Sequence, residues 1–197
     1  MAKRSFLDTA YDARTGEEVE QFYEKWAATY DEEVGSHDYS QPPRCAAALR
    51  SVLKPEDGRI LDVGCGTGLS GVALQDAGFA QIDGCDFSQA MLDKAFATGA
   101  YSKLFRADLN KPPLDAHDGE YAGVTAVGVF SFGHIAPDAM DDLLRVTSPG
   151  GPVVIGMNNH FYEEGSLTAK LDRLADAGAI ERISEEEGDH LPGIGLS

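Results

Sequence analysis

The chain has 197 residues, of which 43% are hydrophobic, which is typical of one domain with a single core. Its formal net charge is -17 and it has no basic run of five or more residues, so we expect no nucleic-acid substrate. No apolar run approaches the roughly 20 residues that span a bilayer, and the N-terminus lacks the apolar region of a signal peptide, so we predict a cytoplasmic protein with no membrane partner.

The N-terminal segment is predicted to contain a helix with an aromatic face. Thr15 and Glu18 form a capping box, and apolar residues then recur at helical spacing as far as Tyr30. Trp26 and Tyr30 lie one turn apart on this face and carry polar atoms that need a partner when buried. The face either packs on the core or closes a pocket as a lid, and both interpretations stay open.

A second helix is predicted over residues 41–53, with prolines in its first turn. Ser40 begins this helix, and Pro55 stops it because proline disfavours a helical conformation in the residue before it. Its predicted buried residues are Cys45, Leu49 and Val52.

A short apolar run followed by a glycine-rich turn is the most informative part of the chain. Residues 60–63 are typical of a buried strand, and Gly64, Gly66 and Gly68 follow at once. Glycines let the backbone approach a ligand closely, and the first N–H groups of the next helix point into the same space. This pattern predicts a ligand-binding turn between a strand and a helix.

Strands and helices alternate along the rest of the chain. Further strands are predicted at residues 81–85, 103–107, 121–127, 152–157 and 180–184. Four helices separate them: one with the apolar face Leu69, Val72 and Ala73, one capped by Ser88 and ended by Gly99, one at residues 137–146, and one capped by Ser166 and ended by Gly178.

This alternation predicts an α/β fold, a Rossmann-like doubly wound and mostly parallel sheet with helices on both faces. We expect one domain over residues 1–197, with N-terminal helices in residues 1–54 forming a lid and a Rossmann-like core in residues 55–197. Ligands of such sheets bind beyond the carboxyl ends of the strands.

Either a dinucleotide such as NAD or another nucleotide-like cofactor could bind at these strand ends. The spacing Gly64-x-Gly66-x-Gly68 puts Leu69 where a dinucleotide fingerprint has its third glycine, so an NAD-binding oxidoreductase fits imperfectly but stays an alternative. Asp86, about 20 residues on, suits a ribose in either case. Asp108, at the tip of the next strand, suits an exocyclic amine such as that of adenine, although either aspartate could also serve only a turn or a cap.

These segments resemble class I S-adenosylmethionine-dependent methyltransferases. The resemblance lies in Ile-Leu-Asp-Val-Gly-Cys-Gly-Thr-Gly at residues 60–68, followed by Asp86 and Asp108. Trp-Ala-Ala-Thr-Tyr-Asp at 26–31, Phe-Ser-Phe-Gly-His-Ile-Ala-Pro at 130–137 and Leu-Arg-Val-Thr-Ser-Pro-Gly-Gly at 144–151 resemble the branch of the Williams–Beuren syndrome region methyltransferase-like proteins.

The resemblance implies S-adenosyl-L-methionine as cofactor, S-adenosyl-L-homocysteine as product, and a set of cofactor-binding residues. The implied set is Trp26 and Tyr30 closing the pocket, Gly64, Cys65 and Gly66 at the methionyl part, Gly68 in the turn, Asp86 at the ribose, Phe87 and Met91 flanking adenine, Asp108 and Leu109 at its edge, and Val127 and Gly128 at the methionyl amine. The family usually ends with an antiparallel seventh strand, which we expect to be truncated or absent here. A catalytically silent cofactor-binding protein is therefore a further alternative.

We expect the methyl acceptor to be a small, partly apolar molecule. The predicted substrate-pocket residues, Phe130, His134, Asn158 and His160, follow the strands at 121–127 and 152–157. His134 could act as a base but could equally bond its own loop, so no residue is assigned as catalytic. Neither these histidines nor Cys45, Cys65 and Cys85 have metal-site spacing, so we predict reduced thiols and no metal. The sequence makes no prediction of the oligomeric state.

Overall fold

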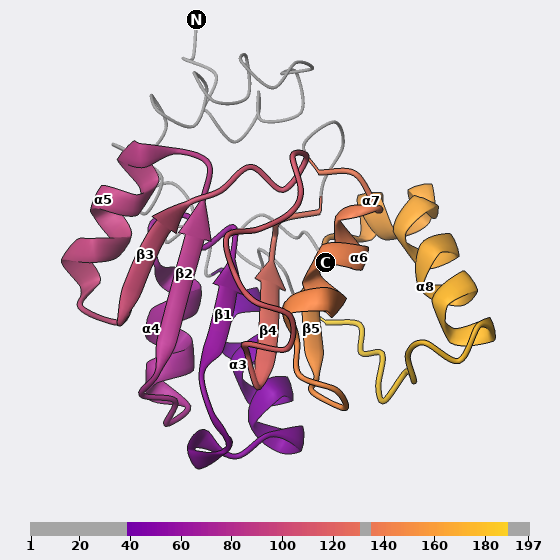
Figure 1. Ribbon diagram of the computed structural model, residues 1–197, viewed down its shortest axis with the longest axis horizontal. Helices are drawn as coiled ribbons and strands as arrows, with labels where there is room; N and C mark the ends of the chain where they lie inside the picture. The colour runs from indigo at the N-terminus through magenta and orange to yellow at the C-terminus, as the bar shows by residue number, and fades with distance from the viewer. Residues whose placement is uncertain (1–38, 131–134, 189–197) are drawn as a thin grey trace, which may run out of the picture.

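The computed structural model describes residues 39–130 and 135–188. A five-stranded sheet in the order β3-β2-β1-β4-β5 forms its centre, and all neighbouring strands are parallel (Figure 1). The strands are β1 (Ile60–Val63), β2 (Ile82–Asp86), β3 (Lys103–Arg106), β4 (Gly123–Val127) and β5 (Val153–Gly156). The strand order reverses between β1 and β4, where a doubly wound sheet opens its ligand crevice. The predicted Rossmann-like fold is confirmed.

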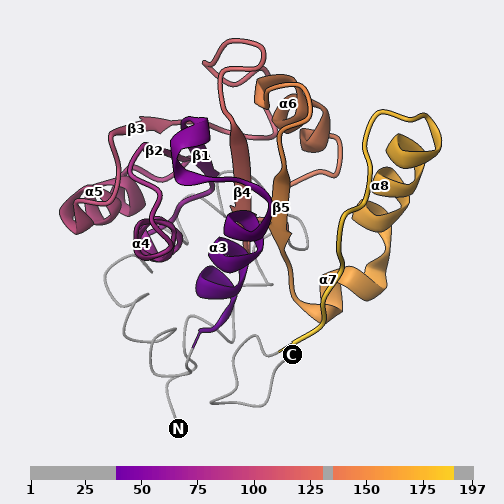
Figure 2. The same cartoon turned by 90° about the horizontal axis from the view of Figure 1, so that it is seen from below.

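Helices cover both faces of this sheet. They are α3 (Gln41–Val52), α4 (Leu69–Asp76), α5 (Gln89–Thr98), α6 (Ala139–Val146), α7 (Asn159–Glu164) and α8 (Ser166–Asp176), with a 3-10 turn at Pro55–Asp57. Figure 2 shows α3, α4 and α5 on one face, α6 on the other, and α8 beyond β5. Both faces of the central strands are therefore removed from water.

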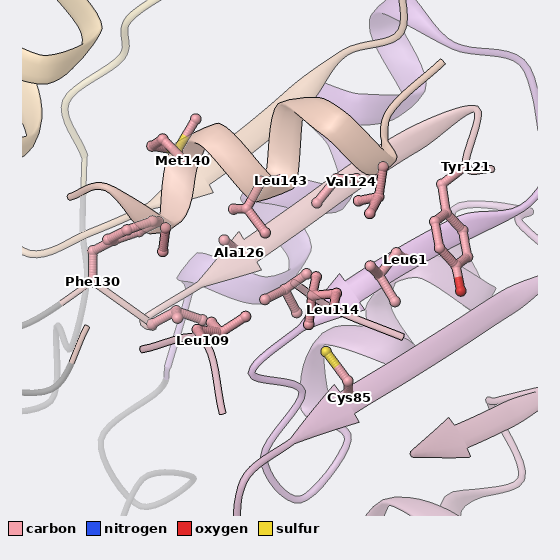
Figure 3. Close-up of a cluster of buried hydrophobic side chains, with 14 of the residues drawn as sticks. Leu61, Cys85, Leu109, Leu114, Tyr121, Val124, Ala126, Phe130, Met140 and Leu143 are labelled. Atoms are coloured by element: carbon pink, nitrogen blue, oxygen red, sulfur yellow. The ribbon is translucent and has the colours of Figure 1, made fainter. Parts of the chain in front are cut away.

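Two apolar clusters hold the layers together. On the α6 side, Leu61 and Val124 pack with Leu143 in a cluster that also takes in α8 (Figure 3). On the other side, Ile60 packs with Leu49 of α3 and with residues of α4. Successive residues of β1 thus point to opposite faces that are both covered, which is why all its residues except Asp62 are apolar.

Two predicted helix faces are corrected by the structure. In α4 the buried residues are Ser70, Gly71 and Leu74, and not the predicted Leu69, Val72 and Ala73. Small residues face inward because α4 lies against the Tyr101 ring, as described below. In α3, Val52 is 43% exposed and Leu53 is buried in its place, while Cys45 and Leu49 are buried as predicted.

The region after β5 differs most from the prediction. No strand forms at residues 180–184, where Ile183 is 66% exposed and no described strand lies alongside to pair with it. Residues 159–164 form helix α7, which the sequence analysis did not predict, and Asn158 caps it. Gly165, not Ser166, is the N-cap of α8. The other predicted strands and helices are confirmed to within two residues at each end.

Several predictions lie outside the described residues. These are the first helix with Trp26 and Tyr30, the pocket residue His134, and the seventh strand that was expected to be truncated or absent. Of the segment assigned to a lid, α3 is described, and it packs in the core through Ala46 and Leu49. The lid hypothesis therefore concerns only the residues that precede α3.

Candidate functional site

The turn after β1 has the geometry of a ligand cradle. Gly64, Gly66 and Gly68 have φ angles of 62°, 53° and 99°, in the left-handed region that favours glycine. A Cβ at Gly64 would lie 2.6 Å from a methyl group of Val129, whereas one at Gly66 would meet no atom of the described residues within 4 Å. The backbone at Gly66 therefore borders open space, and that at Gly64 contacts the segment that follows β4.

Asp86 connects this turn to the end of β2. One carboxylate oxygen accepts a hydrogen bond from the Gly66 N–H at 3.0 Å, and the other accepts from the Ser88 N–H at 2.9 Å. Burial raises the pKa of Asp86 to about 6, and hydrogen bonds from the Ser88 and Gly66 N–H groups oppose that rise. Only 7% of the residue is exposed, so the carboxylate is fixed at the bottom of the cradle.

Asp108 follows β3 and shapes the next turn. Its carboxylate accepts a hydrogen bond from the Asn110 N–H at 3.0 Å and forms an ion pair with Lys111 at 2.9 Å. The side chain is 37% exposed, so a ligand can still reach it. The turn interpretation is thus observed, and binding of the adenine edge by Asp108 and the neighbouring buried Leu109 stays a prediction.

The predicted adenine neighbours differ in access. Met91 is 1% exposed, and its N–H donates to the Ser88 hydroxyl in the cap of α5. Phe87 is half-buried, and its carbonyl accepts a hydrogen bond from Arg106 Nε at 2.7 Å. Cys65 is also buried, with a raised thiol pKa that follows chiefly from burial. The Phe87 side chain can therefore contact a ligand directly, whereas the Met91 and Cys65 side chains are buried in the core beneath the surface.

Beneath the turn lies a buried polar cluster that the sequence analysis missed. The Asp62 carboxylate accepts hydrogen bonds from the hydroxyls of Ser70 at 2.5 Å, Tyr101 at 2.7 Å and Thr125 at 2.9 Å. The Tyr101 oxygen in turn accepts the Gly71 N–H at 3.0 Å. Burial raises the pKa of Asp62, and the three hydroxyl donors lower it. The cluster ties β1, β4 and the start of α4 to one carboxylate.

The Tyr101 ring fills a space that three glycines leave. A Cβ atom would lie 2.2 Å from the ring at Gly71, 2.7 Å at Gly84 and 3.3 Å at Gly68. No side chain fits at Gly71 or Gly84 while the ring is present, and the contact at Gly68 is tight. The only local signal in the sequence was an aspartate, Asp62, inside an otherwise apolar strand.

The carboxyl ends of β4 and β5 lie at the same end of the sheet as those of β1 and β2 and form the other half of the candidate site. Val127 is half-buried and Gly128 is exposed, with a φ of 68°. The Gly128 N–H donates to the Gly156 carbonyl at 2.8 Å, which continues the sheet past β4. Phe130 is 1% exposed and packs in the apolar cluster of the α6 side, so its predicted pocket role would need access that this packing does not give.

The two predicted pocket residues after β5 lie at the start of α7. The Asn158 side-chain oxygen accepts the Phe161 N–H at 2.9 Å and so caps the helix, while His160 is exposed. Their contact with an acceptor stays a prediction. Within residues 39–130 and 135–188, no three histidine, cysteine, aspartate or glutamate side chains are grouped to hold a metal ion. Over the same ranges no helix is long and apolar enough to cross a membrane.

Comparison with known proteins identifies the class. A family model described as a methyltransferase domain matches residues 60–151. Given the parallel sheet and the glycine turn, the chain belongs to the class I S-adenosylmethionine-dependent methyltransferases. It is similar to methyltransferase-like protein 27 of Homo sapiens, with 39% identity over 86% of this chain and 71% of that protein. The predicted resemblance to the Williams–Beuren branch is confirmed.

Two further similarities extend over most of the chain. Phosphatidylethanolamine N-methyltransferase of Cereibacter sphaeroides is 31% identical over 80% of this chain and 75% of its own length. A methyltransferase solved in complex with the Trm112 methyltransferase activator of Haloferax volcanii has a TM-score of 0.62 at 22% identity, covering 79% of this chain and 75% of that one. The second similarity shows the shared fold alone.

The cofactor is S-adenosylmethionine, and the strand-end geometry fits it. Among the described residues, the lack of any neighbour near a Cβ at Gly66 leaves room there for the methionyl chain beside backbone groups. Asp86, immobilised under that space, offers carboxylate lone pairs to hydroxyl donors. The cradle and the carboxylate thus have the chemistry to hold two parts of this ligand, its methionyl chain and its ribose.

Proposed function

We propose that this methyltransferase methylates a small, partly apolar acceptor beyond the ends of β4 and β5. The observation that carries the proposal is the hydrogen bond from the Gly66 N–H to Asp86. It joins the open glycine turn to a carboxylate placed to bind ribose hydroxyls. In this proposal Gly64, Cys65 and Gly66 hold the methionyl part, and Asp86 binds both ribose hydroxyls. The methyl group then faces the ends of β4 and β5.

The bound cofactor would supply a methyl group on a sulfonium, so the transfer is an in-line displacement that needs no covalent intermediate. The residues of the chain have to align the acceptor and exclude water from the reacting atoms. The half-buried Val127 and Met157 offer apolar surface at the two strand ends. The relative from Cereibacter sphaeroides is named for a phospholipid, which has a polar amine on an apolar body, and this supports a partly apolar acceptor.

Binding of the cofactor is tested by titration calorimetry with S-adenosylhomocysteine, S-adenosylmethionine and NADH. We expect the first two to bind and NADH not to bind. Asp86→Ala should weaken S-adenosylhomocysteine at least tenfold, because a charge-assisted hydrogen bond is worth about 1.5 to 3 kcal/mol. Asp93→Ala, an exposed aspartate of the neighbouring α5, is the matched control and should bind normally. Full affinity of Asp86→Ala would disprove the ribose assignment.

The acceptor is tested by measuring S-adenosylhomocysteine formation across a panel. The panel contains amines, phenols, thiols and carboxylates, each as a pair with and without an apolar chain. We expect turnover with one chemical class and a preference for the member with the apolar chain. Tight cofactor binding without turnover across the whole panel would favour the catalytically silent alternative instead.

A further inference from the structure

A buried amide connects the segment before α3 to the ends of β4 and β5. The Tyr39 hydroxyl lies 3.1 Å from Gln41 Oε1, and Gln41 Nε2 lies 2.7 Å from the carbonyl oxygen of Met157, the residue after β5. Gln41 is 4% exposed, so its amide is removed from water. A buried amide needs both bonds, which fixes its orientation.

The direction of each bond follows from which atoms carry protons. The Met157 carbonyl can only accept, so the NH₂ group of Gln41 must face it and Oε1 must face Tyr39. Since Oε1 can only accept, the Tyr39 hydroxyl must donate its single proton to it. Toward any ligand, the Tyr39 oxygen can therefore act only as a hydrogen-bond acceptor.

The Tyr39 oxygen stands over the end of β4. A Cβ at Gly128 would lie 2.8 Å from it, so the phenol covers the Cα of this exposed glycine. The segment after Gly128 touches the cofactor turn, because Val129 packs against Gly64. The oxygen thus lies at the end of β4 beside Gly128, the residue that the resemblance to methyltransferases puts at the methionyl amino group.

We propose that Tyr39 is a specificity-determining residue that accepts a hydrogen bond from the methionyl ammonium group of the cofactor. An ammonium has three donors and no acceptor, so it matches an oxygen that can only accept. A carboxylate in the same place would face a lone pair and be rejected. The proposal rests on the proposed cofactor site, and Gln41 is the positioning residue that sets the direction of the phenol proton.

The test pairs a variant of the protein with a variant of the ligand. Titration calorimetry measures S-adenosylhomocysteine and its deamino analogue, in which hydrogen replaces the α-amino group, with wild type and Tyr39→Phe. We expect Tyr39→Phe to weaken S-adenosylhomocysteine at least tenfold, the usual effect of losing one hydrogen bond to a charged group, and to change the analogue less than about twofold. Tyr162→Phe, which removes an exposed hydroxyl bonded to Glu185, is the matched control and should change neither ligand.

Each other outcome overturns the proposal in its own way. Equal weakening of both ligands would show that Tyr39 only supports the fold. Unchanged affinity for both would show that the phenol serves the methyl acceptor or no ligand. Failure of wild type to bind S-adenosylhomocysteine would instead refute the cofactor site itself.

Gln41→Met supplies a second, independent variant, with thermal melting as the check of folding. This change releases the Tyr39 proton while it keeps the ring, so the phenol can then also donate. The preference for S-adenosylhomocysteine over the deamino analogue should fall about threefold or more. An unchanged preference in a folded Gln41→Met protein would show that the amide does not set the direction of the phenol.

Discussion

The strand-end edge of the sheet has two halves that are built differently. At β1 and β2, Asp62 and Asp86 are buried and receive hydrogen bonds from four or more groups that come from separate elements. At β4 and β5, Gly128 and His160 are exposed, and Asn158 serves its own helix. We name the first the cofactor half and the second the acceptor half after the ligands we propose for them. The cofactor half is preorganised by the core, whereas the acceptor half depends on what covers it.

This difference explains what each half can recognise. A rigid site with satisfied polar groups binds one ligand with little cost of ordering, which suits a cofactor shared across a family. Exposed strand ends can be covered by different segments, so the same fold can bind different methyl acceptors. The effects of substitutions in the two halves should accordingly differ in size, and we order five predictions by their expected effect.

The largest effect is expected for Asp62→Ala. It leaves the hydroxyls of Ser70, Tyr101 and Thr125 without their shared acceptor inside the core. We expect the free energy of unfolding to fall by about 3 to 5 kcal/mol, measured by urea denaturation. Asp76→Ala, an exposed aspartate on α4, should change it by less than about 0.5 kcal/mol. Similar losses for the two variants would contradict a preorganised cofactor half.

The second effect is a pH dependence that comes from Asp86. Its pKa is raised from 3.8 to about 6 in the free protein, so its contribution to stability is present below pH 3.8 and is lost as the pH rises through 6. The loss amounts to about 3 kcal/mol on this shift. Asp86→Asn cannot titrate, so the difference in unfolding free energy between wild type and Asp86→Asn should change by that amount between pH 3 and 7.

Cofactor affinity should follow the opposite direction. Ribose hydroxyls donate to the ionised carboxylate and lower the pKa of Asp86 in the complex, so binding releases a proton. The affinity for S-adenosylhomocysteine should then rise with pH up to about 6 and level off above 7, by as much as tenfold per unit. An affinity that is flat from pH 5 to 7 would argue that no hydroxyl of the ligand reaches Asp86.

A smaller effect is expected for Tyr101→Phe. The ring stays in place, but the Gly71 N–H loses its acceptor and Asp62 loses one of its donors. We expect unfolding to become easier by about 1 to 2 kcal/mol in urea denaturation. Tyr162→Phe loses a hydroxyl on the exposed surface and should cost less than about 0.5 kcal/mol. If both variants lost the same stability, the Tyr101 hydroxyl would contribute no more to folding than an exposed one.

The smallest effect separates two roles of Asn158. Asn158→Ala removes the cap of α7 and should cost about 1 kcal/mol of stability, whereas Asn158→Ser should keep most of it. If Asn158 also touches the acceptor, both variants will lower kcat/KM although only one is destabilised. Normal kcat/KM in Asn158→Ser would leave Asn158 as a helix cap alone, and the acceptor half would lose one predicted residue.

The cofactor half was largely predictable because its signals are local. Three glycines directly after an apolar strand specify a turn, and an aspartate at the end of the next strand must come to the same edge in a parallel sheet. Ser88 and Gly99 fix both ends of α5 in the same way, and both ends are confirmed. The alternation of strands and helices then leaves little choice of topology.

The missed features depend on contacts between distant parts of the chain. Asp62 and Tyr101 are 39 positions apart, and no spacing rule connects them. Residues 180–184 were predicted as a strand from local sequence alone, but a strand needs a neighbour, and none pairs with them in the described part of the chain. Tyr39 and Gln41 could not be assigned either, because only the fold brings them to the end of β4.

The fit of Tyr101 among three glycines limits how this sequence can diverge. Gly71 and Gly84 cannot gain even a methyl group while the ring is present, since the added carbon would lie 2.2 Å and 2.7 Å from ring atoms. Replacing Tyr101 first would open a void and leave the Gly71 N–H without its acceptor. The effects of such changes are therefore strongly non-additive, and a sequence can leave this arrangement only by replacing the tyrosine and a glycine together.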